Sequence, residues 1–187
     1  MTFSELGNSF GLIRSVRVTY GDHPNLPSVS VYFQGCDAIP KCIGCHNPET
    51  WKFDSAYKVE FSHLLKILDR KIEHLLVSHK VISLALLGGE PLTKINREIA
   101  YLLAKFVKEK YGESVRTILY TWRSFKQLLY LDIPLDYFDE FVLGKYVKEY
   151  DTGSFPASKN QIYITRDRLL PILQSLIEWG EKVCQNY

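Results

Sequence analysis

The chain has 187 residues, of which 46% are hydrophobic and 24% are charged, and its formal net charge is +2 at pH 7. This length suits one domain with a full hydrophobic core, and the composition excludes a disordered or fibrous protein. The nearly balanced charge, without a block of lysine and arginine, predicts no nucleic-acid partner. No stretch approaches the roughly 18 apolar residues of a membrane helix, and the first residues lack the pattern of a secretory signal. We therefore expect a cytoplasmic protein with no membrane partner.

The first predicted strand leads directly into a loop that is rich in cysteine. Residues 29–35, "VSVYFQG", mix β-branched and aromatic side chains and end at a glycine, which is typical of a strand. Residues 61–78 place leucine and isoleucine at helical spacing beside charged residues, which predicts an amphipathic helix. The following run, "KVISLALLGGEP" (80–91), is apolar without alternation. This pattern favours a strand that is covered on both faces in a parallel sheet.

The second half of the chain continues the alternation of strands and helices. The expected elements are a helix (96–112), a strand (114–121), a short helix (124–131), two strands (140–146 and 162–165) and a final helix from about Arg168 to Cys184. Alternation at this spacing implies right-handed crossovers and a mainly parallel sheet. We expect a single α/β domain over residues 1–187, open or only partly closed as a (β/α) barrel. Ligands bind such sheets at the carboxyl ends of the strands.

Three of the four cysteines lie within ten residues, in "CDAIPKCIGC" (36–45). In a reducing cytoplasm, clustered cysteines favour metal binding or catalysis over disulfides. Three thiolates are one fewer than a closed zinc site or an ordinary iron–sulfur cluster requires. A 4Fe-4S cluster held by Cys36, Cys42 and Cys45 would therefore leave one iron free to chelate a substrate or cofactor.

Other ligand sets are compatible with the same loop. A zinc site could recruit His46 as its fourth ligand, although the adjacent residues Cys45 and His46 would have difficulty reaching one tetrahedral ion. Cys184 could also be a fourth ligand, but nothing in the sequence places it near the loop. For Cys184 we expect an inert thiol buried in the last helix.

The segment "GGEP" (88–91) follows the buried strand. Two glycines allow the backbone to approach a ligand closely, and the carboxylate of Glu90 can accept hydrogen bonds from an ammonium group. By itself, the segment is more typical of a plain turn between a strand and a helix, with Glu90 near the N-terminus of that helix. Together with the cysteine loop, it predicts a ligand site.

These segments together resemble the radical S-adenosylmethionine enzymes, and within them the small activating enzymes of anaerobic ribonucleotide reductase. The similarity is carried by "FQGCDAIPKCIGCHNPETW" (33–51), "LLGGEPL" (86–92), "LGKY" (143–146) and "GSFPASKNQ" (153–161). Two features depart from the pattern of the family. Five residues separate the first two cysteines where the family usually has three, and Thr121-Trp122 stands where relatives tend to have Thr-Gly.

The resemblance implies a ligand role for particular residues. Cys36, Cys42 and Cys45 would hold the 4Fe-4S cluster, while Gly89 and Glu90 would hold the amino group of S-adenosyl-L-methionine. The backbone at Gly44 and His46 would lie beside the adenine of the cofactor. Lys145 would approach its carboxylate or ribose, although a solvated lysine at a strand end is an equal alternative. The implied cofactor contacts are Gly44, Cys45, His46, Gly89, Glu90 and Lys145.

The resemblance also implies a reaction and its partners. In this family an electron from the cluster cleaves S-adenosylmethionine to a 5′-deoxyadenosyl radical, while the protein supplies ligation and orientation. The expected substrate is a glycine Cα–H of the large subunit of anaerobic ribonucleotide reductase, which becomes a glycyl radical. A low-potential donor such as flavodoxin or ferredoxin would supply the electron. An opening at the side of a small, incomplete barrel would admit a protein loop.

Two other functions compete with this one. A radical enzyme acting on a small molecule, such as a deazaguanine-forming synthase, would share the "GGEP" element, but such synthases tend to follow the third cysteine with "DT" rather than "HNPETW". A non-catalytic iron–sulfur or zinc-binding module would use the cysteines alone. Such a module has no need of "GGEP" or of a free iron.

Overall fold

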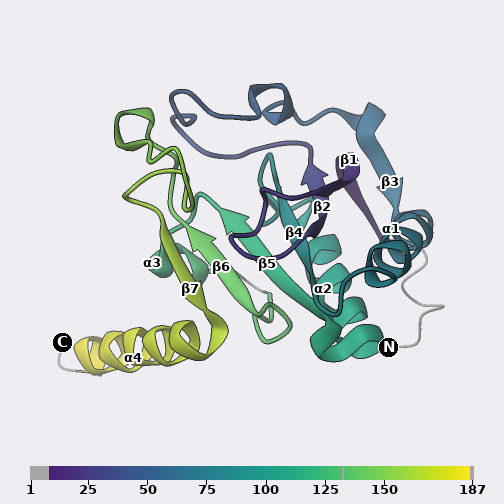
Figure 1. Ribbon diagram of the computed structural model, residues 1–187. Coiled ribbons are helices and arrows are strands. Elements are labelled where there is room, and N and C mark those ends of the chain that lie inside the picture. The colour runs from purple at the N-terminus through teal and green to yellow at the C-terminus, as the bar shows by residue number, and fades with distance from the viewer. Residues whose placement is uncertain (1–8, 132, 186–187) are drawn as a thin grey trace.

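Seven strands form one mixed sheet in the order β3-β1-β2-β4-β5-β6-β7 in the computed structural model, which describes residues 9–131 and 133–185 (Figure 1). The strands are β1 (Phe10–Thr19), β2 (Ser28–Phe33), β3 (Lys58–Glu60), β4 (Ile82–Gly88), β5 (Val115–Thr121), β6 (Glu140–Leu143) and β7 (Ile162–Thr165). The α-helices are α1 (Phe61–Leu76), α2 (Arg97–Tyr111), α3 (Phe125–Leu128) and α4 (Arg166–Gln185). Short 3-10 helices are η2 (Pro48–Thr50), η3 (Ser55–Tyr57), η4 (Gly112–Ser114) and η5 (Lys148–Tyr150).

The four central strands, β2, β4, β5 and β6, run parallel, as the alternation of strands and helices predicts. The outer pairings, β1 with β2, β1 with β3 and β6 with β7, are antiparallel. The sheet is therefore mixed, and the expectation of a mainly parallel sheet is correct only for its centre. The strand β7 turns back because it follows β6 without a helical crossover, and hairpin-like returns of this kind are antiparallel. The strands β1 and β3 come from segments for which the sequence analysis predicted no element.

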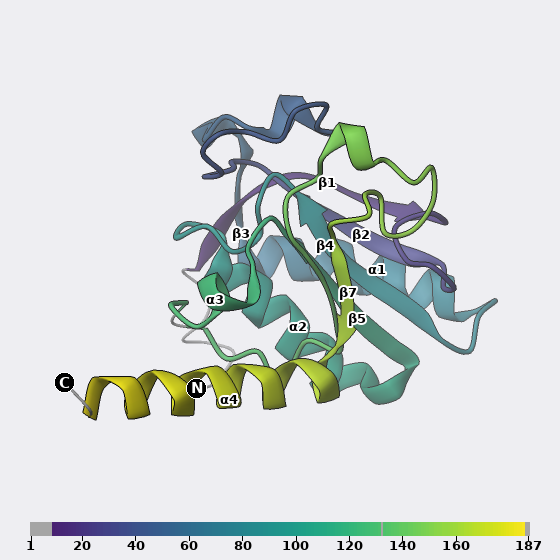
Figure 2. The ribbon, with the colours of Figure 1, turned by 90° about the vertical axis from the view of Figure 1, so that its left-hand side faces the viewer.

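All four helices contribute to a hydrophobic core on one face of the sheet. In α1 the buried residues recur at intervals of three and four positions, at Phe61, Leu64, Leu68, Ile72 and Leu75, so one stripe of the helix packs inward. Helix α4 lies along the end of the sheet opposite to the cysteine loop and extends beyond it (Figures 1 and 2). Among the helices within the described residues, none is both long and apolar enough to span a lipid bilayer.

The other face of the sheet carries a smaller apolar cluster with no helix in it. Along β4, Leu84 and Leu86 pack on the helical side, while Ala85 and Leu87 belong to the opposite cluster. This alternation follows from the period of two in a strand, and it confirms that β4 is covered on both faces. Leu87, Tyr120 and Phe155, which pack against this cluster, also line the cavity described below.

Candidate functional site

The carboxyl ends of the parallel strands lie level with one another. Phe33 at the end of β2 pairs with Gly88 at the end of β4, and Thr121 at the end of β5 pairs with Leu143 at the end of β6. The loops after β2 and β6 rise on this same side of the sheet in both ribbon views (Figures 1 and 2). The cysteine loop and the "GGEP" turn therefore meet at one edge, as the sequence predicted.

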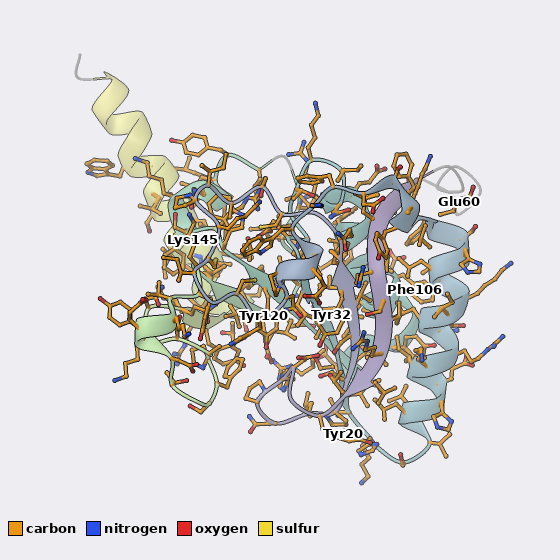
Figure 3. The ribbon with its side chains drawn as sticks, turned by 90° about the horizontal axis from the view of Figure 1, so that it is seen from above. Tyr20, Tyr32, Glu60, Phe106, Tyr120 and Lys145 are labelled. Atoms are coloured by element: carbon orange, nitrogen blue, oxygen red, sulfur yellow. The ribbon has the colours of Figure 1, made fainter. Side chains whose placement is uncertain are left out.

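A cavity of about 770 Å³ opens at this edge, which is within the range of small-molecule sites. Of the predicted site residues, those that line it are Cys36, Cys42, Cys45, His46, Gly89 and Glu90. Gly44 and Lys145, which the structure also describes, are not among the lining residues. Figure 3 looks down on this edge and shows Tyr32 and Tyr120, which also line the cavity, near the centre of the view.

The cysteine loop is closed at its base by backbone hydrogen bonds. The amide of Gly35 donates to the carbonyl of Thr50 at 2.7 Å, and the amide of Cys36 donates to the carbonyl of Trp51 at 3.1 Å. These bonds bring the end of β2 beside the residues that follow the third cysteine. The three thiols are consequently presented from one closed loop.

The thiols of this loop differ in exposure. Cys36 is buried, whereas Cys42 and Cys45 are partly exposed. Burial raises the pKa of the Cys36 thiol and that of the Cys42 thiol above the usual value. A bound metal would supply the positive charge that keeps such thiols deprotonated. The pair Cys42 and Cys45 also shares a turn, since the amide of Cys45 donates to the carbonyl of Cys42 at 3.3 Å.

Within residues 9–131 and 133–185, no group of three or more histidine, cysteine, aspartate or glutamate side chains is arranged to enclose a single metal ion. The ring of His46, the fourth ligand of the alternative zinc site, packs against Tyr146 with ring centroids 4.4 Å apart. Three thiols that line one cavity are the donor type that iron–sulfur clusters take. The donor set thus fits a cluster. The side chain of Cys184 lies outside the described residues, so its expected role is not tested.

The two glycines of "GGEP" pack against the base of the cysteine loop. A Cβ on Gly89 would lie 2.4 Å from the carbonyl oxygen of Gly35, and Gly88 has a φ of +105°. The amide of Gly89 donates to Phe33 at 2.9 Å, and the amide of Glu90 donates to Gly35 at 2.8 Å. The close backbone approach that the glycines permit is therefore an approach between the two loops that line the cavity.

The carboxylate of Glu90 is only 1% exposed and is surrounded by donors. It accepts hydrogen bonds from the amide of Leu92 at 2.9 Å, the hydroxyl of Thr121 at 2.9 Å and 3.0 Å, and the amide of Trp122 at 3.1 Å. A nitrogen of Arg123 lies 2.9 Å away as an ion pair that lacks the alignment of a hydrogen bond. Burial raises the pKa of Glu90 to about 7, although Arg123 and the hydrogen bonds act in the opposite direction. Glu90 is thus a buried acid that titrates near neutral pH.

The residues after β5, in "TWRS" (121–124), lie at the ligand edge as the sequence predicts, but the sequence assigned no partner to Arg123. The side chain of Arg123 is 8% exposed, and its Nη2 donates to Asp37 at 2.6 Å. The indole Nε1 of Trp122 donates to the other oxygen of Asp37 at 2.9 Å. A charged residue directly after a strand that ends at the ligand edge was the available signal. Trp122 was expected only as a departure from the family pattern, without a contact to the cysteine loop.

Lys145 contacts the cysteine loop itself. Its ammonium group donates to the carbonyls of Ile39 at 3.2 Å and Pro40 at 2.9 Å, and it lies 5.4 Å from the centroid of the Trp122 ring. Lys145 therefore supports the segment between the first two cysteines, in the arrangement that the structure describes.

The far end of the cavity is closed by the segment that joins β1 to β2. His23 Nδ1 accepts hydrogen bonds from the amides of Asn25 and Leu26, both at 3.1 Å, so its proton resides on Nε2 and is donated to Glu140 at 2.9 Å. Burial raises the pKa of Glu140, but the hydrogen bonds from His23 and Tyr163, together with the nearby charge of Arg116, leave that pKa below its usual range. This buried pair fixes the wall of the cavity opposite to the cysteines.

An α/β domain with three cysteines and a buried acid around one cavity has the features of an iron–sulfur protein. Residues 27–164 match the family described as a 4Fe-4S single cluster domain. The chain is also 31% identical over 124 residues to the anaerobic ribonucleoside-triphosphate reductase-activating protein of Enterobacteria phage T4. The aligned region covers 66% of this chain and 74% of that protein. The chain belongs to the family of anaerobic ribonucleoside-triphosphate reductase-activating proteins.

Proposed function

We propose that this protein is a radical S-adenosylmethionine enzyme that installs a glycyl radical on the large subunit of anaerobic ribonucleotide reductase. The observation that carries the proposal is the meeting of two separate segments at one cavity. The three loop cysteines (Cys36, Cys42 and Cys45) and Glu90 all line it. A simple electron-transfer module would need only the cysteines. The relative from phage T4, which is named as an activating protein of the same reductase, supports the choice of partner.

The proposed ligands of the 4Fe-4S cluster are the three loop cysteines, with the fourth iron left for the cofactor. When bound, the cluster would supply the electron that cleaves S-adenosylmethionine, and the resulting 5′-deoxyadenosyl radical would take a hydrogen atom from a glycine Cα. The protein would bind and orient these groups and keep water away from them. Gly89 and Glu90 would face the amino group of the cofactor, with Gly44, Cys45 and His46 beside its adenine. Lys145 would affect cofactor binding indirectly, by holding the carbonyls of Ile39 and Pro40 in the cysteine loop.

The ionised form of Glu90 would favour the ammonium group of the cofactor. Its lone pairs are already shared among Leu92, Thr121 and Trp122, so we expect its charge to contribute more than a new hydrogen bond. Two carboxylates, Glu90 and Asp37, face one guanidinium, that of Arg123. The added positive charge of an ammonium group would balance this cluster of charges.

The proposal extends to the shape of the domain and to the electron donor. Residues 1–187 would form one radical-S-adenosylmethionine domain, with its sheet a partial barrel whose open side admits a loop of the reductase. The helix-free face of the sheet supports this, because it leaves the cavity reachable from that side. A low-potential cytoplasmic protein such as flavodoxin or ferredoxin would reduce the cluster.

Anaerobic reconstitution followed by product analysis tests the proposal. We expect about four iron and four sulfide per chain and formation of 5′-deoxyadenosine, with a glycyl radical signal only when the reductase is present. Cys42→Ala should abolish both the cluster and the cleavage, while the matched substitution Cys184→Ala should leave both intact. Zinc binding without iron, or a full cluster that never yields 5′-deoxyadenosine, would contradict the proposal. Cleavage stimulated by a small molecule but not by the reductase would point to the competing class of radical enzymes.

A further inference from the structure

A buried arginine joins the cysteine loop to the "GGEP" turn. Arg123 Nη2 lies 2.6 Å from Asp37, the residue directly after Cys36, and Arg123 Nη1 lies 2.9 Å from Glu90. We propose that Arg123 is a positioning residue, which holds the first part of the cysteine loop in a fixed relation to Glu90 and so sets the affinity for the cofactor. This inference rests on the proposed function, because it concerns how that same site is held in shape.

The segment between Cys36 and Cys42 requires such support because burial does little to fix it. Within residues 37–41 only Ala38 is buried, and its side chain is a single methyl group, whereas Ile39 is 88% exposed. Apart from the burial of Ala38, the contacts that hold this segment are polar. They are the bonds of Asp37 to Trp122 and Arg123, of Lys41 to the carbonyl of Cys36, and of Lys145 to the carbonyls of Ile39 and Pro40.

The shape of the guanidinium suits the bridging role. A planar group with several donors can contact two carboxylates at once, whereas the ammonium of a lysine is a single point of charge. Arg123 also lies over the ring of Trp122, with its Cζ 4.8 Å from a ring centroid, and that indole donates to the second oxygen of Asp37. Asp37 is therefore held by two adjacent residues that follow β5, and one of them, Arg123, is buried.

The same contacts define a path from the loop to the acid. Asp37 contacts Arg123, and Arg123 contacts Glu90. Glu90 accepts a hydrogen bond from the amide of Trp122, and the indole of Trp122 donates back to Asp37, which closes a ring of four residues. Loss of the Asp37 charge leaves Arg123 with one carboxylate in place of two. The guanidinium can then move toward Glu90, and the residue after the first cysteine is no longer tied to the acid through side chains, while the backbone bonds at Gly35 and Cys36 remain. Residues that share such a network show coupled effects on substitution.

The test uses Asp37→Asn, because Asp37 is on the surface side of the network and its replacement leaves the buried residues in place. The matched control is Asp54→Asn in the same loop, where the carboxylate only caps the short helix η3 through the amide of Ala56 at 2.9 Å. Both variants lose one negative charge from one loop. The first readout is the backbone hydrogen exchange of residues 36–46 in the metal-free proteins. The second is the concentration of S-adenosylmethionine that half-saturates the change in the electron paramagnetic resonance spectrum of the reconstituted, reduced cluster.

We expect Asp37→Asn to speed exchange in residues 36–46 and to weaken cofactor binding about three- to tenfold, with an unchanged iron content. Asp54→Asn should bind the cofactor as the wild type does. The double variant with Arg123→Lys should be no weaker than the weaker single variant, since both changes break one network. A wild-type affinity in Asp37→Asn, or an equal loss in Asp54→Asn, would overturn the inference. If the cluster spectrum of the wild-type protein does not respond to the cofactor, the proposed function is refuted instead. The hydrogen-exchange readout does not depend on the cofactor, so unchanged exchange in Asp37→Asn would refute the network in either case.

Discussion

The substitution Glu90→Gln tests the buried acid through the pH dependence of stability. The ordinary pKa of a glutamate is 4.5, and burial raises the pKa of Glu90 to about 7 in the folded protein. The folded state therefore binds this proton more tightly than the unfolded state does. The stability that results is fully present below about pH 4.5 and is lost as the pH rises through about 7. A difference of this size corresponds to about 3 kcal/mol.

Most of this loss falls in a range where the protein can be studied. Between about pH 5 and about pH 8, the free energy of unfolding of the wild type should fall by roughly 2 to 3 kcal/mol more than that of Glu90→Gln. At about pH 5 the variant should be less stable by about 1 to 3 kcal/mol, because its amide nitrogen faces a donor such as the amide of Trp122. At about pH 8 the difference between the two proteins should approach zero. At that pH Glu90 of the wild type is ionised, so the stability that the protonated acid contributed is lost.

Urea unfolding of the metal-free proteins at the two pH values measures this difference. Glu109→Gln on the exposed side of α2 is the control, and its difference from the wild type should not change with pH. A stability difference between wild type and Glu90→Gln that grows with pH would refute the reasoning. It would show that Arg123 stabilises the ionised acid more than burial destabilises it. On the reconstituted preparation, the same substitution should lower cofactor affinity about five- to a hundredfold.

Two further predictions concern the walls of the cavity. Gly89→Ala should destabilise the protein by about 3 kcal/mol, because its Cβ would lie 2.4 Å from a backbone carbonyl oxygen of the cysteine loop, whereas Gly21→Ala, with no atom near its Cβ, should change stability by less than about 0.5 kcal/mol. Thermal unfolding of both variants checks this, and equal effects would contradict the packing argument. His23→Leu should cost about 3 kcal/mol and raise the pKa of Glu140, because it removes a hydrogen bond from a buried carboxylate. An unchanged pKa of that carboxyl, followed by nuclear magnetic resonance, would show that the other partners of Glu140 suffice.

The centre of the fold was predictable because its strands have a strong local signal. The apolar run of β4 and the leucine spacing of α1 each indicate one kind of element, and both are confirmed. The edges were not predictable in the same way. Strand β1 carries charged residues at Arg14 and Arg17 and has only three buried positions, so its pairing depends on a partner that is distant in sequence. Strand β3 has three residues, too few for any periodic pattern.

The site was predictable where one residue type carries the chemistry. Three cysteines in one loop and a glutamate after two glycines are visible in the sequence, and the structure brings them to one cavity. The partners of those residues were not visible. Asp37 and Arg123 are 86 residues apart, and either would have been assigned to a solvated surface. An ion pair of this separation depends on the order of strands in the sheet, which local pattern does not specify.

The additional residues of the cysteine loop are accommodated without disturbing the junction on which the cavity is built. The base of the loop is fixed by backbone bonds from Gly35 to Thr50 and from Glu90 to Gly35, none of which involves residues 37–41. A loop that grows above a fixed base keeps its ends together at a small entropic cost, since closure entropy rises only slowly with length. The exposed middle of the loop must also be held in one conformation. Side chains that follow β5 and β6, those of Trp122, Arg123 and Lys145, hold it through their contacts with residues 37–40. The spacing of the first two cysteines can therefore change while the contact between the cysteine loop and the "GGEP" turn stays the same.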